Sequence, residues 1–180
     1  MQWKWNSELI GIIGAEQVGK SHFFKHFLLP KIPKNRLIVL DTNYEYQKYG
    51  AQVVIPKEYN ARWLDGFLKN IRAKSSNICL VFEDLDIYLA DGKRSEELMK
   101  LGINGAHQNI GGVWFSHRAL GIPKVFLMRT RFLILFAGLS PEDALYLGQI
   151  APCITPEVLP SEPRKAVLTD KSKIWKFTTG

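Results

Sequence analysis

Hydrophobic residues gather in short continuous runs along this chain, and amphipathic stretches separate them. The five runs are Leu9–Ile13, Leu37–Leu40, Ile78–Phe82, Gly112–Ser116 and Phe132–Phe136. Apolar runs without polar alternation predict parallel strands that are covered on both faces. A shorter run, Gln52–Ile55, ends at Pro56 and predicts an edge strand. Strands that alternate with helices predict an α/β fold, a mainly parallel sheet flanked by helices.

The amphipathic stretches predict four helices, most of them with a recognisable start or end. The stretches are Ser21–Leu29, Ala61–Lys74, Ser95–Leu101 and Pro141–Leu147. Pro30 stops the first helix, because proline cannot continue a helical hydrogen-bond pattern. Asn60 and Ser140 are expected N-caps. Gly102 and Gly105 are expected to interrupt the third helix.

The last thirty residues have a different pattern. Four prolines, at positions 152, 156, 160 and 163, precede two short runs, Ala166–Leu168 and Ile174–Phe177, with a turn at Asp170–Lys171 between them. This pattern predicts a β-hairpin at the edge of the sheet. Length and composition predict one domain over residues 1–180, with the proline-rich segment and hairpin of residues 151–180 packed on it.

The residues after the first apolar run match the phosphate-binding pattern G-x-x-x-x-G-K-[ST]. A strand precedes the motif and a helix follows it, which is the geometry that turns backbone N–H groups toward a triphosphate. Lys20 is expected to reach the β- and γ-phosphates, and the Ser21 hydroxyl to ligate Mg²⁺. The predicted nucleotide-binding residues are Gly14, Ala15, Glu16, Gln17, Val18, Gly19, Lys20, Ser21 and His22.

Two carboxylates, Glu83 and Asp84, follow the third apolar run. In a P-loop protein, one acid at this point holds Mg²⁺ through its water shell, and the other orients or deprotonates the attacking water. We assign Glu83 to the metal and Asp84 to the water. The strand ending at Asp41 lies between the P-loop and these acids in the chain, which is typical of the ASCE, RecA-like branch of P-loop ATPases and not of simple nucleotide kinases.

Further polar residues stand at strand ends. His117 follows the fourth long run and is expected to face the γ-phosphate as a sensor, whereas Arg118 is equally well explained as a surface residue. Arg129 and Arg131 precede the fifth run, and either one is a candidate finger for the nucleotide of a neighbouring subunit.

The composition is that of a globular protein, with 46% hydrophobic residues and a formal net charge of +7. A basic balance favours a polyanionic partner, although nucleotide binding alone also explains it. The two cysteines form no disulfide framework or metal spacing. The longest uncharged apolar stretch, 132–139, is too short for a bilayer, so we expect neither secretion nor membrane insertion.

Two basic clusters are candidates for sequence-independent contacts with DNA phosphates. They are Lys69, Arg72 and Lys74, and the tail residues Arg164, Lys165, Lys171, Lys173 and Lys176. The loops at Lys93–Arg94 and at Gly102–Gly105 are alternatives.

Together these motifs resemble the FtsK–HerA superfamily of DNA-pumping P-loop ATPases. The resemblance rests on the P-loop, the strand that runs into Asp41 and Glu45, the Glu83–Asp84 strand, and the segment Val113–Ala119, which is similar to a family strand ending in Thr-Gln-Arg-Pro. His117 replaces the usual Gln, Ala119 replaces the Pro, and the order of the two acids is inverted. A single-domain version is most similar to the genome-packaging ATPases of tailless icosahedral double-stranded DNA viruses, including archaeal ones.

The resemblance implies ATP as the nucleotide and a homo-oligomeric ring, often a hexamer, with DNA in its pore and arginines acting in trans. We therefore expect an ATP-hydrolysing motor that packages double-stranded DNA, with a capsid or portal-vertex protein as a further partner, in the host cytoplasm or the virion. The alternatives are a related motor for protein secretion, conjugation or filamentous-phage assembly, and a nucleotide-dependent switch.

Overall fold

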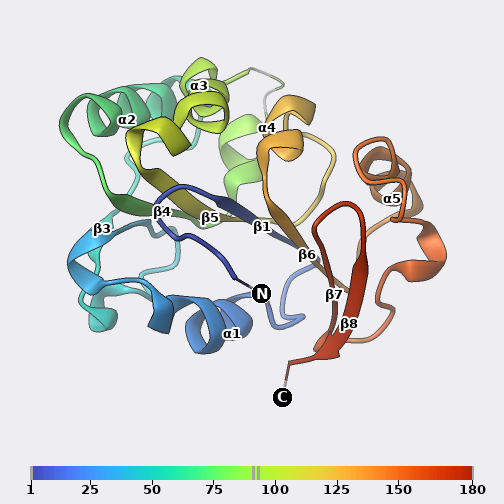
Figure 1. Cartoon of the computed structure of the whole chain (residues 1–180). Helices are drawn as coiled ribbons and strands as arrows, with labels where there is room; N and C mark the ends of the chain where they lie inside the picture. Colours follow the sequence, from blue (N-terminus) through green and yellow to red (C-terminus); the bar gives the residue numbers. More distant parts are fainter. Residues whose placement is uncertain (1, 91, 93, 180) are drawn as a thin grey trace.

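A computed structural model describes residues 2–90, 92 and 94–179 of the chain. Two residues of the charged loop at 91–94, Asp91 and Lys93, therefore lie outside the described residues. Figure 1 shows a central sheet with helices on both of its faces.

Within the described residues, eight strands form one sheet, in the order β3-β2-β4-β5-β1-β6-β7-β8. The strands are β1 Leu9–Ile13, β2 Leu37–Leu40, β3 Gln52–Val54, β4 Ile78–Phe82, β5 Ile110–Ser116, β6 Phe132–Phe136, β7 Lys165–Thr169 and β8 Ile174–Thr178. The pairs among β1 to β6 are parallel. The hairpin β7–β8 joins β6 in antiparallel orientation. The fold is thus the predicted α/β architecture, with β3 at one edge and the C-terminal hairpin at the other.

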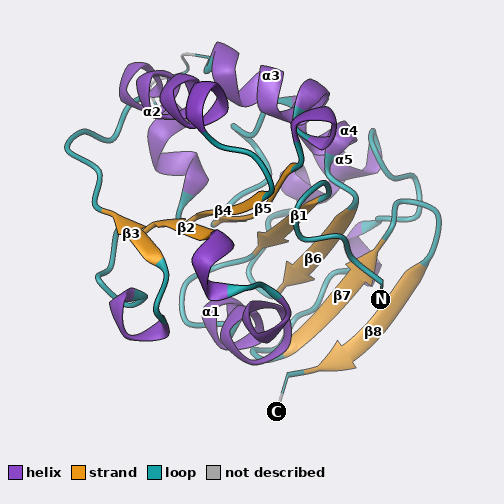
Figure 2. Cartoon of the chain, turned by 60° about the vertical axis from the view of Figure 1, so that its left-hand side comes forward, coloured by secondary structure: helices purple, strands orange, loops and turns teal. Residues whose placement is uncertain are grey.

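The helices lie in two layers on either side of the sheet. They are α1 Lys20–Phe23, α2 Ala61–Lys74, α3 Glu96–Asn104, α4 Lys124–Arg129 and α5 Pro141–Gly148. The view in Figure 2 shows α2, α3 and α4 above the sheet and α1 below it. β5 separates the P-loop strand β1 from the acid-bearing strand β4. This order is that of the predicted ASCE branch.

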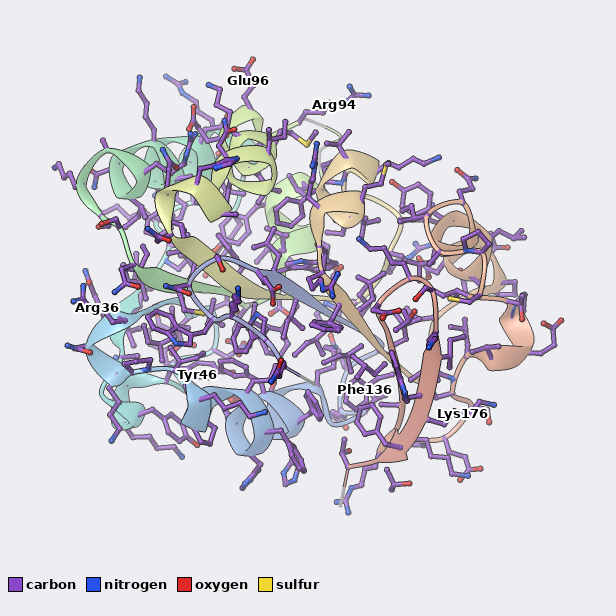
Figure 3. All side chains as sticks on the ribbon, viewed as in Figure 1. Arg36, Tyr46, Arg94, Glu96, Phe136 and Lys176 are labelled. Atoms are coloured by element: carbon purple, nitrogen blue, oxygen red, sulfur yellow. The ribbon has the colours of Figure 1, made fainter. Side chains whose placement is uncertain are left out.

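Each face of the sheet has its own hydrophobic core. Alternate residues of β1 show the division, because Leu9 and Ile13 belong to the core under α2 to α5 while Ile10 and Ile12 belong to the core over α1. Tyr46 and Phe136, labelled in Figure 3, are fully buried on the α1 side. The two cores hold β1 and β4 rigidly, so the loops at their carboxyl ends start from fixed points.

The structure corrects three details of the predicted helices. Pro30 does not end the first helix: α1 continues as a π-turn over Phe24–Leu28 and a 3-10 turn over Leu29–Lys31, where Pro30 stands in the first turn and needs no hydrogen-bond partner. Gly102 does not interrupt α3. Helix α4 was not predicted, because its six residues are too few to show periodicity.

The position of Gly102 has a packing reason. A Cβ atom at this position would lie 3.0 Å from a ring carbon of Phe126 in α4. The glycine therefore lets α4 approach α3 closely, and this gain outweighs its low helix propensity.

Candidate functional site

The P-loop occupies the carboxyl end of β1, as the motif requires. Two of its glycines have positive φ angles, 158° at Gly14 and 107° at Gly19. A side chain at Gly14 would also meet Phe136, whose Cβ lies 2.6 Å from the position of the missing Cβ. The Ala15 amide donates to the carbonyl of Ala137 at 2.9 Å. Ala137 directly follows β6, so this hydrogen bond anchors the loop to the end of that neighbouring strand. Both glycines are thus needed for the shape of the loop.

Lys20 lies across the loop and is 8% exposed. Its Nζ donates to the carbonyls of Gly14 and Ala15, at 2.6 and 2.7 Å. Burial lowers the pKa of Lys20, while the nearby carboxylates of Asp84, Asp86 and Glu16 counteract this shift. The ammonium group is therefore held at the loop, near the acids that follow β4.

A cavity of about 590 Å³ opens over the P-loop. It is lined by Glu16, Gln17, Gly19, Lys20, Ser21, His22, Asn43, Glu45, Glu83, Asp84, Phe115 and His117. The carboxyl ends of β1, β2, β4 and β5 supply these residues, which is where open α/β sheets bind ligands. The predicted P-loop residues Glu16, Gln17, Gly19, Lys20, Ser21 and His22 thus line one cavity together with both acids and His117, whereas Gly14, Ala15 and Val18 do not line it.

Glu83 lies at the bottom of this site and is 3% exposed. Burial raises the pKa of Glu83 to about 8, and the carboxylates of Asp41, Asp84 and Glu45 add to the rise. The hydroxyl of Tyr46 lies beside it and counteracts the rise in part, although this buried hydroxyl has no hydrogen-bond partner of ordinary geometry among the described residues. Asn43 donates from Nδ2 to the Glu83 carboxylate at 3.3 Å. Such a carboxyl favours its neutral form near pH 7 until a cation comes close.

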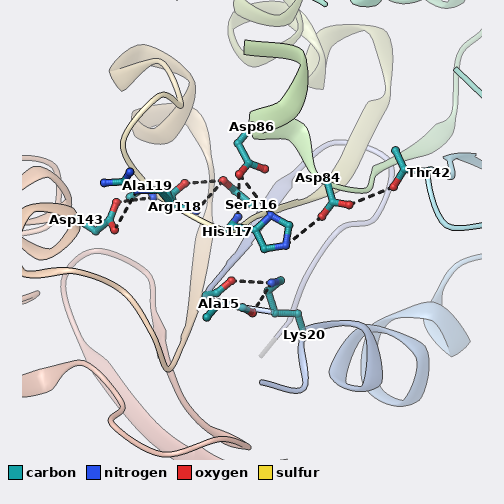
Figure 4. A network of polar contacts seen from close by, with 11 residues as sticks. Ala15, Lys20, Thr42, Asp84, Asp86, Ser116, His117, Arg118, Ala119 and Asp143 are labelled. Carbon is teal, nitrogen blue, oxygen red and sulfur yellow. Dashed lines mark hydrogen bonds and ion pairs between the residues drawn. The ribbon is translucent and has the colours of Figure 1, made fainter. Parts of the chain in front are cut away.

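Asp84 faces the cavity in a strained backbone conformation, with φ 51° and ψ 56°. Its carboxylate accepts a hydrogen bond from Thr42 Oγ1 at 3.1 Å and lies 3.6 Å from Nε2 of His117. Figure 4 shows the imidazole of His117 between Asp84 and Asp86, and its Nδ1 lies 3.5 Å from Asp86. A residue held in the left-handed region next to a cavity is a frequent feature of functional sites.

The loop after β5 is tied to helix α5 by a buried carboxylate. Asp143, 1% exposed, accepts the amides of Ala119 and Leu120 at 2.8 and 3.0 Å, and it forms a capping box with Ser140. The exposed guanidinium of Arg118 stands 4.0 Å from the same carboxylate. Arg118 therefore turns toward α5 and does not line the cavity.

Arg129 and Arg131 lie away from this site. Arg129 ends α4, and Arg131 precedes β6, where its amide donates to the carbonyl of Leu9. Because β6 runs parallel to β1, both arginines are exposed at the amino-terminal end of the parallel strands, opposite the end that carries the P-loop. They do not contact the nucleotide site of their own subunit.

Sequence reasoning assigned no specific role to several residues of the site. Asn43 and Tyr46 reach it from the segment after β2, Asp86 reaches it from the 3-10 turn Leu85–Leu89, and Asp143 acts through the loop after β5. The buried carboxylate of Asp41, which accepts the Tyr46 amide at 2.8 Å, shapes the loop that carries Asn43. The polar run after β2 was the available signal for Asn43, and no signal in the sequence pointed to Asp143.

The donor set of the cavity fits Mg²⁺ bound together with a nucleotide. The described residues contain no cluster of three or more His, Cys, Asp or Glu that could hold a metal ion alone. Mg²⁺ takes only one or two protein ligands in such sites and shares the others with phosphates and water. Ser21 and Glu83 both line the cavity, and the buried carboxyl gains most from a nearby cation.

Comparison with known proteins supports the fold assignment. Neither protein-family models nor the sequences of curated proteins give a match. Among solved structures, the genome-packaging NTPase B204 of Sulfolobus turreted icosahedral virus 2, in complex with AMPPCP, superposes with a TM-score of 0.79 at 15% identity, over 96% of this chain and 98% of that one. The DNA-packaging ATPase B204 of Sulfolobus turreted icosahedral virus gives a TM-score of 0.76 at 17% identity, over 96% and 98%.

A second group of similar structures contains larger proteins. ATPases 2 and 3 of EssC from Geobacillus thermodenitrificans superpose with a TM-score of 0.70 at 14% identity, over 99% of this chain and 41% of that one. The type VII secretion ATPase EccC of Thermomonospora curvata gives a TM-score of 0.62 at 12% identity, over 94% and 25%. The chain therefore has the fold of P-loop ATPases. It is similar in structure to viral genome-packaging ATPases, as the predicted resemblance implied, and to the ATPases of EssC and EccC.

Proposed function

We propose that this protein hydrolyses ATP and uses the energy to move double-stranded DNA during the packaging of a viral genome. The observation that carries the proposal is the assembly of the P-loop, Glu83, Asp84 and His117 around one cavity, in a fold that superposes over its whole length on a packaging ATPase. A nucleotide switch needs no such set of acids at the γ-phosphate end.

We assign a role to each residue. The P-loop amides hold the phosphates, and Lys20 leaves the Gly14 and Ala15 carbonyls to contact the β- and γ-phosphates. Ser21 and Glu83 would hold Mg²⁺, Glu83 through water, and the bound ion would supply positive charge at the phosphates. Asp84 accepts a proton from the attacking water, with Thr42 and His117 fixing its position.

Fewer basic side chains are candidates for DNA contacts than the sequence implied. Arg72 pairs with Glu97 at 2.6 Å, and Lys171 donates to the carbonyl of Met128. Lys69 and Lys74 on α2, and Lys173 and Lys176 on the hairpin, remain exposed for phosphate contacts.

A ring of identical subunits gives Arg129 and Arg131 a role. A head-to-tail interface places one surface of a subunit on a different surface of the next, so residues far from their own P-loop can meet the neighbour's. We propose a closed ring, with a hexamer as the first expectation, a capsid or portal-vertex protein as partner, and the host cytoplasm or virion as location. The described residues contain no helix that is long and apolar enough to cross a membrane.

A protein-directed motor is the second candidate. The similarity to the ATPases of EssC and to the type VII secretion ATPase EccC favours it, because these proteins share the fold of this chain. A motor of this kind would use the same cavity for hydrolysis and would differ in the polymer that it moves.

One experiment separates these functions. ATP hydrolysis is measured with and without long double-stranded DNA, at low and moderate salt, for the wild type and for Lys20→Ala. We expect DNA to stimulate hydrolysis, the stimulation to weaken as salt rises, and both to vanish in Lys20→Ala. Hydrolysis that ignores DNA would refute the packaging proposal in favour of the protein-directed motor, and a complete absence of hydrolysis would favour a switch.

A further inference from the structure

The open end of the C-terminal hairpin packs directly on the P-loop. The amide of Arg164, the residue before β7, donates to the carbonyl of Val18 at 3.0 Å. Thr179, the residue after β8, donates from its amide and its hydroxyl to the carbonyl of Arg164, at 2.8 and 3.1 Å. A Cβ at Gly19 would lie 3.3 Å from Thr179 Oγ1 and 3.9 Å from Arg164 Cα. These contacts fix Arg164 beside the loop.

The backbone of Arg164 is held in an unusual conformation. Its φ of 63° lies in the left-handed region, which non-glycine residues rarely adopt. The side chain is exposed and forms no ion pair with any described residue, whereas the neighbouring Lys165 pairs with Glu162 at 2.6 Å. A long cationic side chain is thus anchored at the P-loop without a partner among the described residues.

The side chains that line the cavity carry more negative than positive charge, so a further cation would be favourable there. Four acids line it, Glu16, Glu45, Glu83 and Asp84, while Lys20 is the only lysine or arginine among the described residues that line it. A nucleoside triphosphate adds several negative charges to this site. Mg²⁺ and Lys20 serve the β- and γ-phosphates, so the α-phosphate end lacks a protein cation.

We propose that Arg164 binds the α-phosphate end of the bound nucleotide and that the hairpin serves to position it. Lys20 extends toward Asp84 and Asp86 at the γ-phosphate end, while Arg164 flanks Gly19, in the part of the loop whose amides cradle the α- and β-phosphates. The guanidinium supplies charge-assisted hydrogen bonds there. Arg164 is therefore a nucleotide contact of its own subunit and not one of the DNA contacts that the sequence suggested. This inference rests on the proposed nucleotide binding.

The test measures the dissociation constants of ATP, ADP and AMP, with Mg²⁺ and without DNA, for the wild type, Arg164→Gly and Lys165→Ala. Glycine suits the positive φ, so Arg164→Gly removes the guanidinium without straining the backbone. All three nucleotides carry the α-phosphate, so we expect Arg164→Gly to weaken each of them by roughly tenfold. Lys165→Ala should change none by more than about twofold, because its ammonium faces Glu162. Arg164→Lys should restore most of the affinity.

Three results would overturn the proposal. The first is an unchanged affinity in Arg164→Gly, and the second is a loss confined to ATP, which would place the guanidinium at the γ-phosphate. The third is a loss of affinity together with a lower melting temperature of the nucleotide-free variant, which would assign the effect to an undocked hairpin. Because the assay contains no DNA, its outcome is independent of the proposed DNA motor.

Discussion

The two acids after β4 differ more in their surroundings than their adjacent positions suggest. Glu83 is buried against Asn43 and Tyr46, whereas Asp84 faces the cavity beside Thr42 and His117. Burial raises the pKa of Glu83 and makes a nearby cation favourable, while a hydrogen bond from Thr42 and the nearby imidazole of His117 hold the Asp84 carboxylate in place. Two neighbouring carboxylates can in this way serve different steps of one reaction.

This division predicts different defects for the two amides. Asp84→Asn should leave ATP and Mg²⁺ affinity nearly intact and lower kcat by about 10²- to 10⁴-fold, because it removes the base. Glu83→Gln should raise the Mg²⁺ concentration needed for half-maximal hydrolysis. Steady-state kinetics with titrated Mg²⁺ distinguishes the two. Glu96→Gln, on the exposed face of α3, is the control and should match the wild type. An intact kcat in Asp84→Asn would show that the base lies elsewhere.

Lys171 offers a second test at the residue scale. Burial and, to a smaller extent, the positive charge of Arg131 together lower its pKa to about 8. Because this pKa lies below that of an exposed lysine, the buried charge costs stability below pH 8, and the cost disappears as pH rises from about 8 toward 10.5. We expect Arg131→Gln to raise the pKa of Lys171 without restoring the ordinary value, since burial is the larger cause. An NMR titration of methylated lysines measures it, and an unmoved pKa would contradict the electrostatic influence of Arg131.

At the scale of elements, the cap of helix α5 also organises the loop after β5. Ser140 accepts the amide of Asp143 at 3.1 Å, and the Asp143 carboxylate reaches back to Ser140 and across to Ala119 and Leu120. A single buried side chain thus fixes the start of a helix and the loop that follows His117. This arrangement links the γ-phosphate end of the cavity to α5.

The arrangement predicts a graded loss of stability. Asp143→Ala should lower the free energy of unfolding by about 2–4 kcal/mol, because it leaves buried amides without an acceptor. Ser140→Ala removes only the cap and should cost about 1 kcal/mol. Glu142→Gln, exposed in the same turn, should change stability by less than about 0.5 kcal/mol. Urea denaturation measures all three, and equal values for Asp143→Ala and Glu142→Gln would refute the role of the buried carboxylate.

In the whole molecule, the P-loop and the candidate finger arginines lie at opposite ends of the parallel strands. One subunit cannot bring them together, because the length of the rigid strands separates them. The proposed ring brings the arginine-bearing end of one subunit to the cavity of the next. An active site shared in this way has a distinctive consequence when two inactive variants are mixed.

We expect a mixture of Lys20→Ala and Arg131→Ala to regain part of the hydrolysis that each variant lacks alone. A site that combines the intact P-loop of one subunit with the intact arginine of its neighbour is complete. The same experiment with Arg129→Ala shows which arginine acts. Mixing Lys20→Ala with Asp84→Asn is the control: both changes lie in one cavity, so every cavity in the mixed rings keeps one defect and no activity should return. Equal recovery in both mixtures would refute a finger in trans.

The sequence by itself determined the strand order along the chain, the position of the P-loop, the two acids and the C-terminal hairpin. These features rest on local patterns: an apolar run, a glycine motif and a proline are visible within a few residues. The structure confirms the predicted α/β P-loop fold, and the comparisons show the predicted similarity to viral genome-packaging ATPases. The roles of the site residues, including His117, Arg129 and Arg131, remain predictions.

Only the tertiary structure decided which side chains meet. Asn43 contacts Glu83, which lies forty positions further along the sequence. Asp143 accepts amides of the loop after β5, which precedes its own helix. Arg164 lies at the P-loop although it is near the other end of the chain. Gly102 remains helical because α4 packs on it. Such contacts depend on how separate elements pack, and burial then sets the charge state of groups such as Glu83. No local pattern encodes these contacts or these charge states, because both arise only when distant segments share one core.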